Sequence, residues 1–148
     1  MVEDVIIRHP REKKSKCSLE PLRGRHDLRF LTATPDFSFD ATGFLLLSID
    51  APVISSEDAD LPILLLDSTW RLLPRLEACL SGEPVRRSLP ASLQTAYPRI
   101  SKTGVDPPRG LASVEALFAA RLLQGRSTGG LLDHYHWRVA FLRQFPYL

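Results

Sequence analysis

The stretch that most constrains the fold is residues 61–75, where an apolar run stops abruptly at a carboxylate; it reads LPILLLDSTWRLLPR. Residues 63–66 form a short continuous apolar run after a proline, which is typical of a strand buried on both faces of a parallel sheet. Asp67 ends the run, and apolar residues at helical spacing follow it. With Asp67 or Ser68 as the N-cap, the stretch predicts a strand, a tight turn and a helix.

The end of this predicted strand is also where a functional site is expected. In open α/β sheets, ligands bind at the carboxyl ends of the strands. Asp67 and Trp70 stand at that position, and their spacing of three residues puts both on one side of the first helical turn. The simpler alternative is that Asp67 only caps the helix and Trp70 only packs.

Further elements follow from the same kind of pattern. The sequence predicts strands over residues 2–8, 27–32, 44–49 and 85–89, and a short helix at 55–59 between two of the apolar runs. A strand, a short crossover and a second strand favour a parallel sheet. Pro74 either kinks the helix after Asp67 or restarts it as a first-turn residue. Ser113 is predicted to cap an amphipathic helix that ends at Gly125, and a last helix is predicted over 128–145.

Charge is distributed unevenly along the 148 residues, a length that suits one domain. Residues 8–29 hold eight basic side chains against three acidic ones, whereas residues 36–67 hold seven acids and no Lys or Arg. A basic segment of this kind predicts an anionic partner, most commonly a nucleic acid, with a solvated surface as the alternative. The candidate phosphate contacts are Arg8, Arg11, Lys13, Lys14, Lys16, Arg23 and Arg25.

Several classes of site find no support in the sequence. No standard phosphate-loop, dinucleotide, nucleophile-elbow or zinc-protease motif is present. Cys17 and Cys79 lack metal-ligand spacing, and His134 and His136 would point to different faces of a helix, so we expect no metal site. We also expect no signal sequence, no membrane span and a cytoplasmic setting.

Three patches carry a resemblance to a known family. They are HPRE at 9–12 with KCSL at 16–19, DSTW at 67–70, and GLASVEAL at 110–117 with Trp137 and residues 141–142 beyond. In this order they resemble the superfamily that joins the aminocarboxypropyltransferases of small-subunit ribosomal RNA with the DTW-domain tRNA-uridine aminocarboxypropyltransferases. The resemblance covers residues 8 to about 142. The Ser113 patch is closer to the ribosomal-RNA branch, and DSTWR at 67–71 is closer to the DTW branch.

The resemblance implies a fold and a reaction. The fold would be a SPOUT-like α/β domain, with a mostly parallel sheet flanked by helices and a C-terminal trefoil knot. The single domain 1–148 would divide into a basic strand and loop region, 1–40, and a cofactor-binding core, 41–148. The activity would be transfer of the 3-amino-3-carboxypropyl group of S-adenosylmethionine (SAM) to a ring nitrogen of uridine or pseudouridine in rRNA or tRNA, as in ribosome biogenesis or tRNA modification.

The resemblance also implies roles for particular residues. Trp70 would provide an apolar wall and a cation–π contact to the sulfonium. Asp67 would accept the imide proton or stabilise the positive end of the cofactor. Ser18 would lie near the methionine part of SAM. The adenosine pocket and its surroundings would use Leu47, Leu66, Leu89, Leu93, Ser113 and Glu115.

The chain departs from the family pattern at a few positions. Ser68 stands where the ribosomal-RNA branch usually has cysteine, and residues 95–98 replace an asparagine-containing loop. The zinc-ligand cysteines often found ahead of the DTW domain are missing. Two alternatives therefore stay open: a SPOUT-type RNA methyltransferase, and a non-catalytic RNA-binding factor in ribosome assembly.

Overall fold

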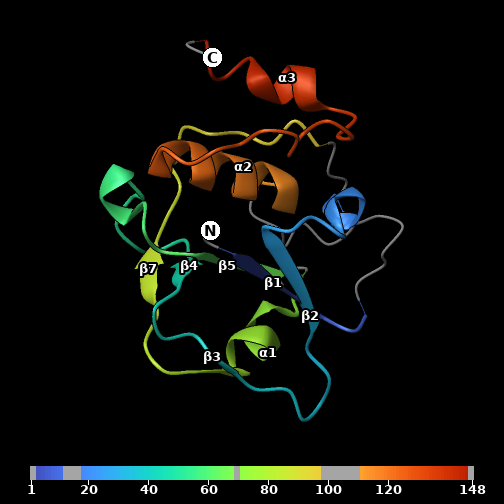
Figure 1. Cartoon of the computed structure of the whole chain (residues 1–148), viewed down its shortest axis with the longest axis vertical. Coiled ribbons are helices and arrows are strands. Elements are labelled where there is room, and N and C mark those ends of the chain that lie inside the picture. The colour runs from blue at the N-terminus through green and yellow to red at the C-terminus, as the bar shows by residue number, and fades with distance from the viewer. Residues whose placement is uncertain (1–2, 12–17, 69–70, 98–110, 147–148) are drawn as a thin grey trace.

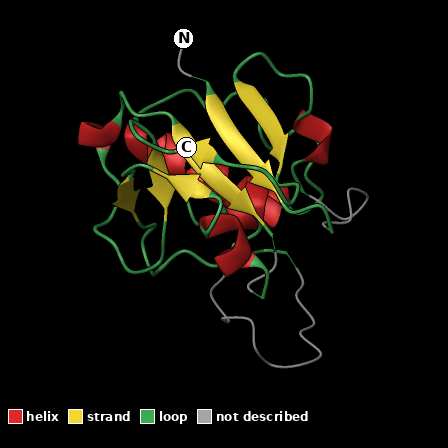
Figure 2. Ribbon diagram, turned by 90° about the horizontal axis from the view of Figure 1, so that it is seen from below, coloured by secondary structure: helices red, strands yellow, loops and turns green. Residues whose placement is uncertain are grey.

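A five-stranded parallel sheet forms the centre of the computed structural model, which describes residues 3–11, 18–68, 71–97 and 111–146. The sheet has the order β2-β1-β5-β4-β7 (Figure 1). Its strands are β1 (Asp4–Arg8), β2 (Leu28–Thr32), β4 (Leu45–Leu47), β5 (Ile63–Asp67) and β7 (Val85–Arg87). Each pairing in this sheet is parallel, which confirms the predicted sheet type. Figure 2 shows the strands lying side by side.

The two central strands form because their side chains are apolar on both faces. In β1, Ile6 packs into one core cluster while Val5 and Ile7 pack into the other. In β5, Ile63 and Leu64 divide between the same two clusters. Strands covered on both faces read as continuous apolar runs, so the sequence pattern located them correctly.

Helices cover both faces of the sheet (Figure 1). The helix α2 (Ser113–Gln124) lies on one face, and α3 (Arg138–Leu142) lies beyond it. The helix α1 (Leu73–Glu77) lies on the other face, next to a small parallel pair of β3 (Phe39–Asp40) and β6 (Leu80–Ser81). Two 3₁₀ turns, η2 (Glu20–Leu22) and η3 (Ser56–Asp58), lie on the α2 side, since Leu22 and Ile54 pack in that core.

Helix boundaries differ from the predictions in three places. The predicted N-cap at Asp67 or Ser68 is wrong, because α1 begins at Leu73 with Pro74 in its first turn. Ser113 is the first residue of α2 rather than its cap, a position that Ala112 occupies. The last helix is limited to α3, because residues 129–134 and 136–137 form turns and Gly130 has a φ of +79°. Gly125 ends α2 as predicted, also with a φ of +79°.

A buried ion-pair network fastens α2 to the amino ends of the strands. Asp4 is fully buried; its Oδ2 lies 2.7 Å from Arg121 Nε and its Oδ1 lies 2.9 Å from Arg126 Nη1. The same carboxylate accepts a hydrogen bond from the backbone N–H of Ile63. Arg121 also reaches Asp27, at 2.8 Å. Breaking a buried pair on one side leaves an uncompensated charge, so this network fixes how α2 lies on the sheet.

Asp27 gives this network a pH dependence. Hydrogen bonds from Arg25 hold the pKa of the Asp27 carboxyl well below its usual range against the opposing effect of burial, and Arg121 adds to the lowering. A carboxyl whose pKa is lowered by folding stabilises the protein fully above its unfolded pKa, and this contribution is lost as the pH falls below that value.

We therefore expect Asp27→Asn to lower the free energy of unfolding at pH 7 by about 1 to 3 kcal/mol. The difference from wild type should shrink as the pH falls from about 5 to about 2. Urea denaturation across that range measures it, with Asp36→Asn at an exposed carboxylate as the control. A difference that stays constant down to pH 2 would contradict this assignment.

Candidate active site

The carboxyl ends of β1 and β5 meet at a buried ion pair. Arg8 and Asp67 are register partners, and Arg8 Nε lies 3.4 Å from Asp67 Oδ2. Both residues are more than nine-tenths buried. Arg8 Nη1 also lies 2.6 Å from Glu20 Oε2, and the guanidinium stacks over the Phe30 ring. The predicted site residue Asp67 is thus held in place at the end of the sheet.

The N-terminus of α2 is joined to the same point. Ser113 Oγ donates a hydrogen bond of 2.6 Å to Asp67 Oδ1. Ser18 Oγ accepts a hydrogen bond of 3.1 Å from the backbone N–H of Val114. Three residues that the sequence predicted separately therefore gather at one helix end, where unpaired N–H groups carry partial positive charge.

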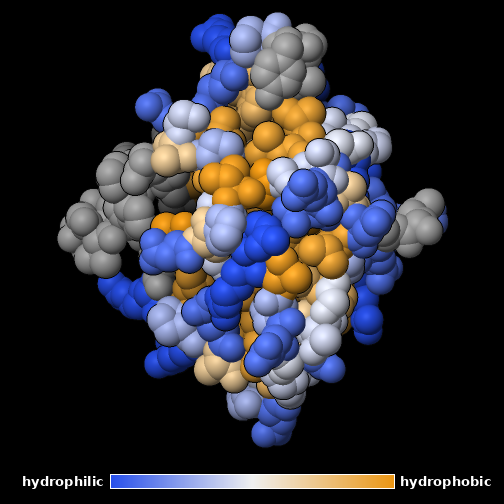
Figure 3. Space-filling view, turned by 90° about the vertical axis from the view of Figure 1, so that its left-hand side faces the viewer, coloured by the Kyte–Doolittle hydropathy of each residue, from blue (hydrophilic) through white to orange (hydrophobic). Residues whose placement is uncertain are grey.

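The predicted apolar residues do not all lie together. Leu47, Leu89 and Leu93 are partly buried against the core cluster on the α2 side of the sheet. Leu66 instead packs against the cluster on the α1 side, because side chains alternate along β5. The side of the molecule that carries β4 and β7 shows apolar surface beside a hydrophilic band (Figure 3). The structure thus brings three of the four leucines to one face.

Glu115 is buried completely and holds backbone and side chains from three segments. Its Oε1 accepts hydrogen bonds from Thr95 Oγ1 at 2.6 Å and from the Ala112 N–H at 2.8 Å. Its Oε2 accepts from the Ala96 N–H at 2.8 Å and from Tyr135 OH at 3.0 Å. Glu115 therefore positions residues 95–96 against α2. A glutamate at the third helical position signals the Ala112 contact, but the sequence gives no sign of Tyr135.

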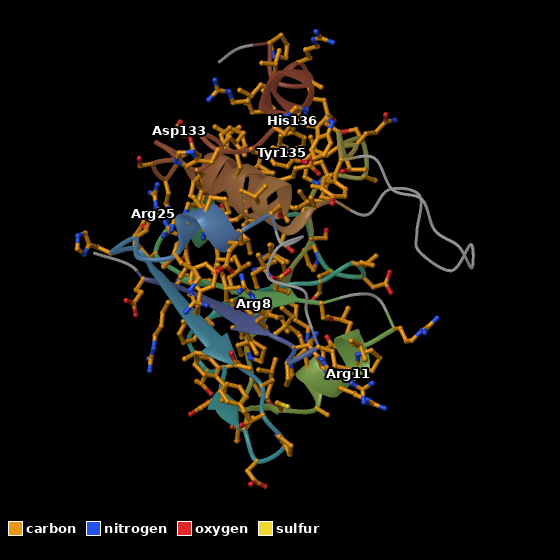
Figure 4. All side chains as sticks on the ribbon, turned by 90° about the vertical axis from the view of Figure 1, so that its right-hand side faces the viewer. Arg8, Arg11, Arg25, Asp133, Tyr135 and His136 are labelled. Atoms are coloured by element: carbon orange, nitrogen blue, oxygen red, sulfur yellow. The ribbon has the colours of Figure 1, made fainter. Side chains whose placement is uncertain are left out.

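The predicted phosphate contacts have different environments. The structure corrects the prediction that Arg8 contacts phosphate. Its side chain is buried against Glu20 and Asp67 rather than presented at the surface. Arg25 is bound on both sides of its guanidinium, by the Asp27 carboxylate and by the Gly129 carbonyl. Arg11 and Arg23 are exposed. Figure 4 shows Arg8 within the fold, Arg25 near Asp133, and Arg11 beside α1.

Four predicted site residues lie outside the described part of the chain: Lys13, Lys14, Lys16 and Trp70.

His9 is a residue whose role the sequence reasoning missed. It follows β1 directly, is 8% exposed, and accepts a hydrogen bond on Nδ1 from the Arg11 N–H at 3.1 Å. Burial lowers the pKa of His9, and the positive charges of Arg11 and Arg75 lower it further. The imidazole is therefore neutral at pH 7, in surroundings that are already positive. Its place beside arginines from two elements could not be inferred from the HPRE motif.

Within the described ranges, no group of three or more His, Cys, Asp or Glu side chains is placed to hold a metal ion. None of the helices found there is long and apolar enough to cross a membrane.

Comparison with solved structures finds a protein of the same fold. The structure of the SAM-dependent rRNA:acp-transferase Tsr3 from Vulcanisaeta distributa superimposes with a TM-score of 0.71. The two sequences are 21% identical, and the match covers 97% of this chain and 79% of that one. The chain thus has a Tsr3-like α/β fold with a parallel sheet. No protein-family model and no curated protein matches the sequence.

We expect Glu115→Gln to lower the free energy of unfolding by about 1 to 3 kcal/mol. The amide offers one acceptor oxygen where the carboxylate offers two, and its NH₂ group would face another donor. Chemical denaturation measures the change, with the exposed Glu57→Gln as the control. Equal stability of the two variants would show that Glu115 does not have this positioning role.

Proposed function

We propose that the chain is a SAM-dependent aminocarboxypropyltransferase that acts on RNA. The observation that carries the proposal is the gathering of Asp67, Ser113 and Ser18 at the N-terminus of α2, beside the carboxyl ends of β1 and β5. The fold supports it, since the Tsr3 structure that it resembles is described as a SAM-dependent rRNA:acp-transferase. The sequence resemblance points independently to the same chemistry.

The donors at the start of α2 fit the amino-acid end of SAM. The backbone N–H of Ser113 has no hydrogen-bond partner among the residues whose positions are described. The Ser18 hydroxyl uses its oxygen to accept from Val114, which leaves its own proton to donate. A carboxylate suits two such donors at a helix N-terminus. The partly buried Leu47, Leu89 and Leu93 would provide the apolar surface that an adenine ring needs.

The reaction requires an electrophilic carbon, and bound SAM would supply it as the methylene attached to its sulfonium. In such a transfer the ring nitrogen of uridine would form the new C–N bond as the C–S bond broke, the electron pair would go to sulfur, and a base on the protein would take the ring N–H proton. Asp67 is our candidate for that base. Arg8 and Ser113 fix the orientation of its carboxylate. Holding reacting groups in position in this way accelerates group transfer by proximity.

The finer features belong to the same proposal. They are a uridine or pseudouridine ring nitrogen as the acceptor, an rRNA or tRNA substrate, a SPOUT-like core with a trefoil knot, and a cytoplasmic location. The family patterns around Ser113 and around DSTWR at 67–71 support the acceptor, the substrate and the core, and the basic segment supports an RNA partner. The cytoplasmic location is proposed because the two cysteines form no disulfide framework in the sequence.

Calorimetric titration with SAM tests the cofactor site. We expect micromolar affinity, about −8 kcal/mol. Ser18→Ala should weaken binding about tenfold or more, because a hydrogen bond to a charged group is lost. Ser38→Ala, at an exposed serine outside the site, is the control. Trp70→Ala should weaken binding as well, on the basis of the sequence resemblance. Unchanged affinity in both Ser18→Ala and Trp70→Ala would place the cofactor elsewhere.

Labelled SAM identifies the transferred group. With RNA as the acceptor, label in the carboxyl carbon should reach the RNA and label in the methyl group should not. The opposite result would indicate a methyltransferase. If neither label is transferred and RNA binding persists when Asp67 and Trp70 are replaced, the protein is a non-catalytic RNA-binding factor.

A further inference from the structure

Three exposed arginines follow the carboxyl ends of the adjacent strands β1 and β5. Arg11, Arg71 and Arg75 are exposed, and none has an ion pair with any residue of known position. Many other arginines in the described part of the chain are paired with an Asp or Glu: Arg8, Arg25, Arg86, Arg87, Arg121 and Arg126.

These three side chains come from two neighbouring points of the fold. Arg11 lies in the segment that follows β1. A hydrogen bond from the His9 N–H to the Asp67 carbonyl holds the start of this segment beside β5. Arg71 and Arg75 follow β5, the strand beside β1, and Arg75 is part of α1. Figure 4 shows Arg11 beside α1. The charges of Arg11 and Arg75 both lower the pKa of His9, which is consistent with both lying near it.

Little at this position cancels the positive charge. His9 is neutral and accepts a hydrogen bond from Arg11, so it adds no charge of its own. The nearby Asp67 is buried and directed at Arg8 and Ser113. Three guanidinium groups with no ion-pair partner among the described residues attract phosphate, which they can bind through paired N–H donors.

We propose that Arg11, Arg71 and Arg75 form a binding patch for RNA backbone phosphates, at the carboxyl edge of the sheet beside Asp67. The identity of the ligand as RNA rests on the proposed function; the patch itself rests on the position of the three exposed arginines after the neighbouring strands β1 and β5, and on the lack of an ion pair to any of them among the described residues. The patch would hold the RNA next to the end of β5. Arg71 and Arg75 lie outside the basic segment from which the sequence predicted phosphate contacts.

The salt dependence of RNA binding tests the patch. Fluorescence anisotropy with a single-stranded, uridine-rich RNA oligonucleotide gives the slope of log K against log salt. Each lost phosphate contact reduces that slope by about 0.7 for a single strand. The double variant Arg71→Ala, Arg75→Ala should therefore reduce it by about 1.4. The double variant Arg71→Lys, Arg75→Lys should keep the wild-type slope, because it keeps both charges.

Arg143→Ala is the matched control. Arg143 is exposed and directly follows α3, which lies on the opposite side of the sheet from α1 (Figure 1). Its removal should leave the slope unchanged. The proposal would be overturned if Arg71→Ala, Arg75→Ala kept the wild-type slope. It would also be overturned if Arg143→Ala reduced the slope as much as that double variant does.

SAM calorimetry on the same variants separates this proposal from the proposed function. The arginine variants should retain wild-type SAM affinity. If the wild-type protein binds SAM but no RNA, the patch is wrong and the cofactor assignment stands. If the wild type binds no SAM, but Arg71→Ala, Arg75→Ala lowers the slope of log K against log salt by the expected amount, the patch stands. The transferase proposal then fails.

Discussion

The hydrogen bond from Ser113 to Asp67 connects the end of the central strand to the start of the main helix, and the candidate site depends on it. Arg8 supports the same carboxylate from the neighbouring strand. Because both residues of the ion pair are buried, losing Arg8 would remove a counter-charge from the Asp67 carboxylate, whereas losing Asp67 would leave the Arg8 guanidinium its bond to Glu20. These contacts therefore fix the relative positions of the end of β5, the start of α2 and the segment around Ser18. A site that orients two reactants requires such fixed positions.

The sequence predicted the parts of the fold that local pattern controls. The strand before Asp67 was found because it is apolar on both faces, and Gly125 was found because a helix end favours a left-handed residue. The cap at Asp67 was wrong because α1 begins only at Leu73, and the Asp67 carboxylate accepts a hydrogen bond from Ser113, which is 46 residues away. Local pattern cannot reveal a contact between residues so far apart in the sequence.

Burial also divides a basic segment that looks uniform in the sequence. Arg8 and Arg25 read like Arg11 and Arg23, yet Arg8 and Arg25 are bound within the fold and the other two are exposed. The difference arises from Glu20, Asp27 and Asp67, whose positions depend on strand pairing. Charge counting predicts an anionic partner for such a segment, but only the fold shows which cations can reach it.

The helix α2 is linked to β1 directly at one end and through Asp67 of β5 at the other, so the helix and the strand must match in length. Asp4 begins the strand and pairs with Arg121, whereas Arg8 ends it beside the Asp67 carboxylate that Ser113 contacts. Four strand residues advance by about 13 Å, and eight helical residues advance by about 12 Å. A residue inserted between Asp4 and Arg8, or between Ser113 and Arg121, would break either the Arg121–Asp4 contact or the Ser113–Asp67 contact. Changes in chain length can therefore be tolerated in the connecting segments but not between these paired positions.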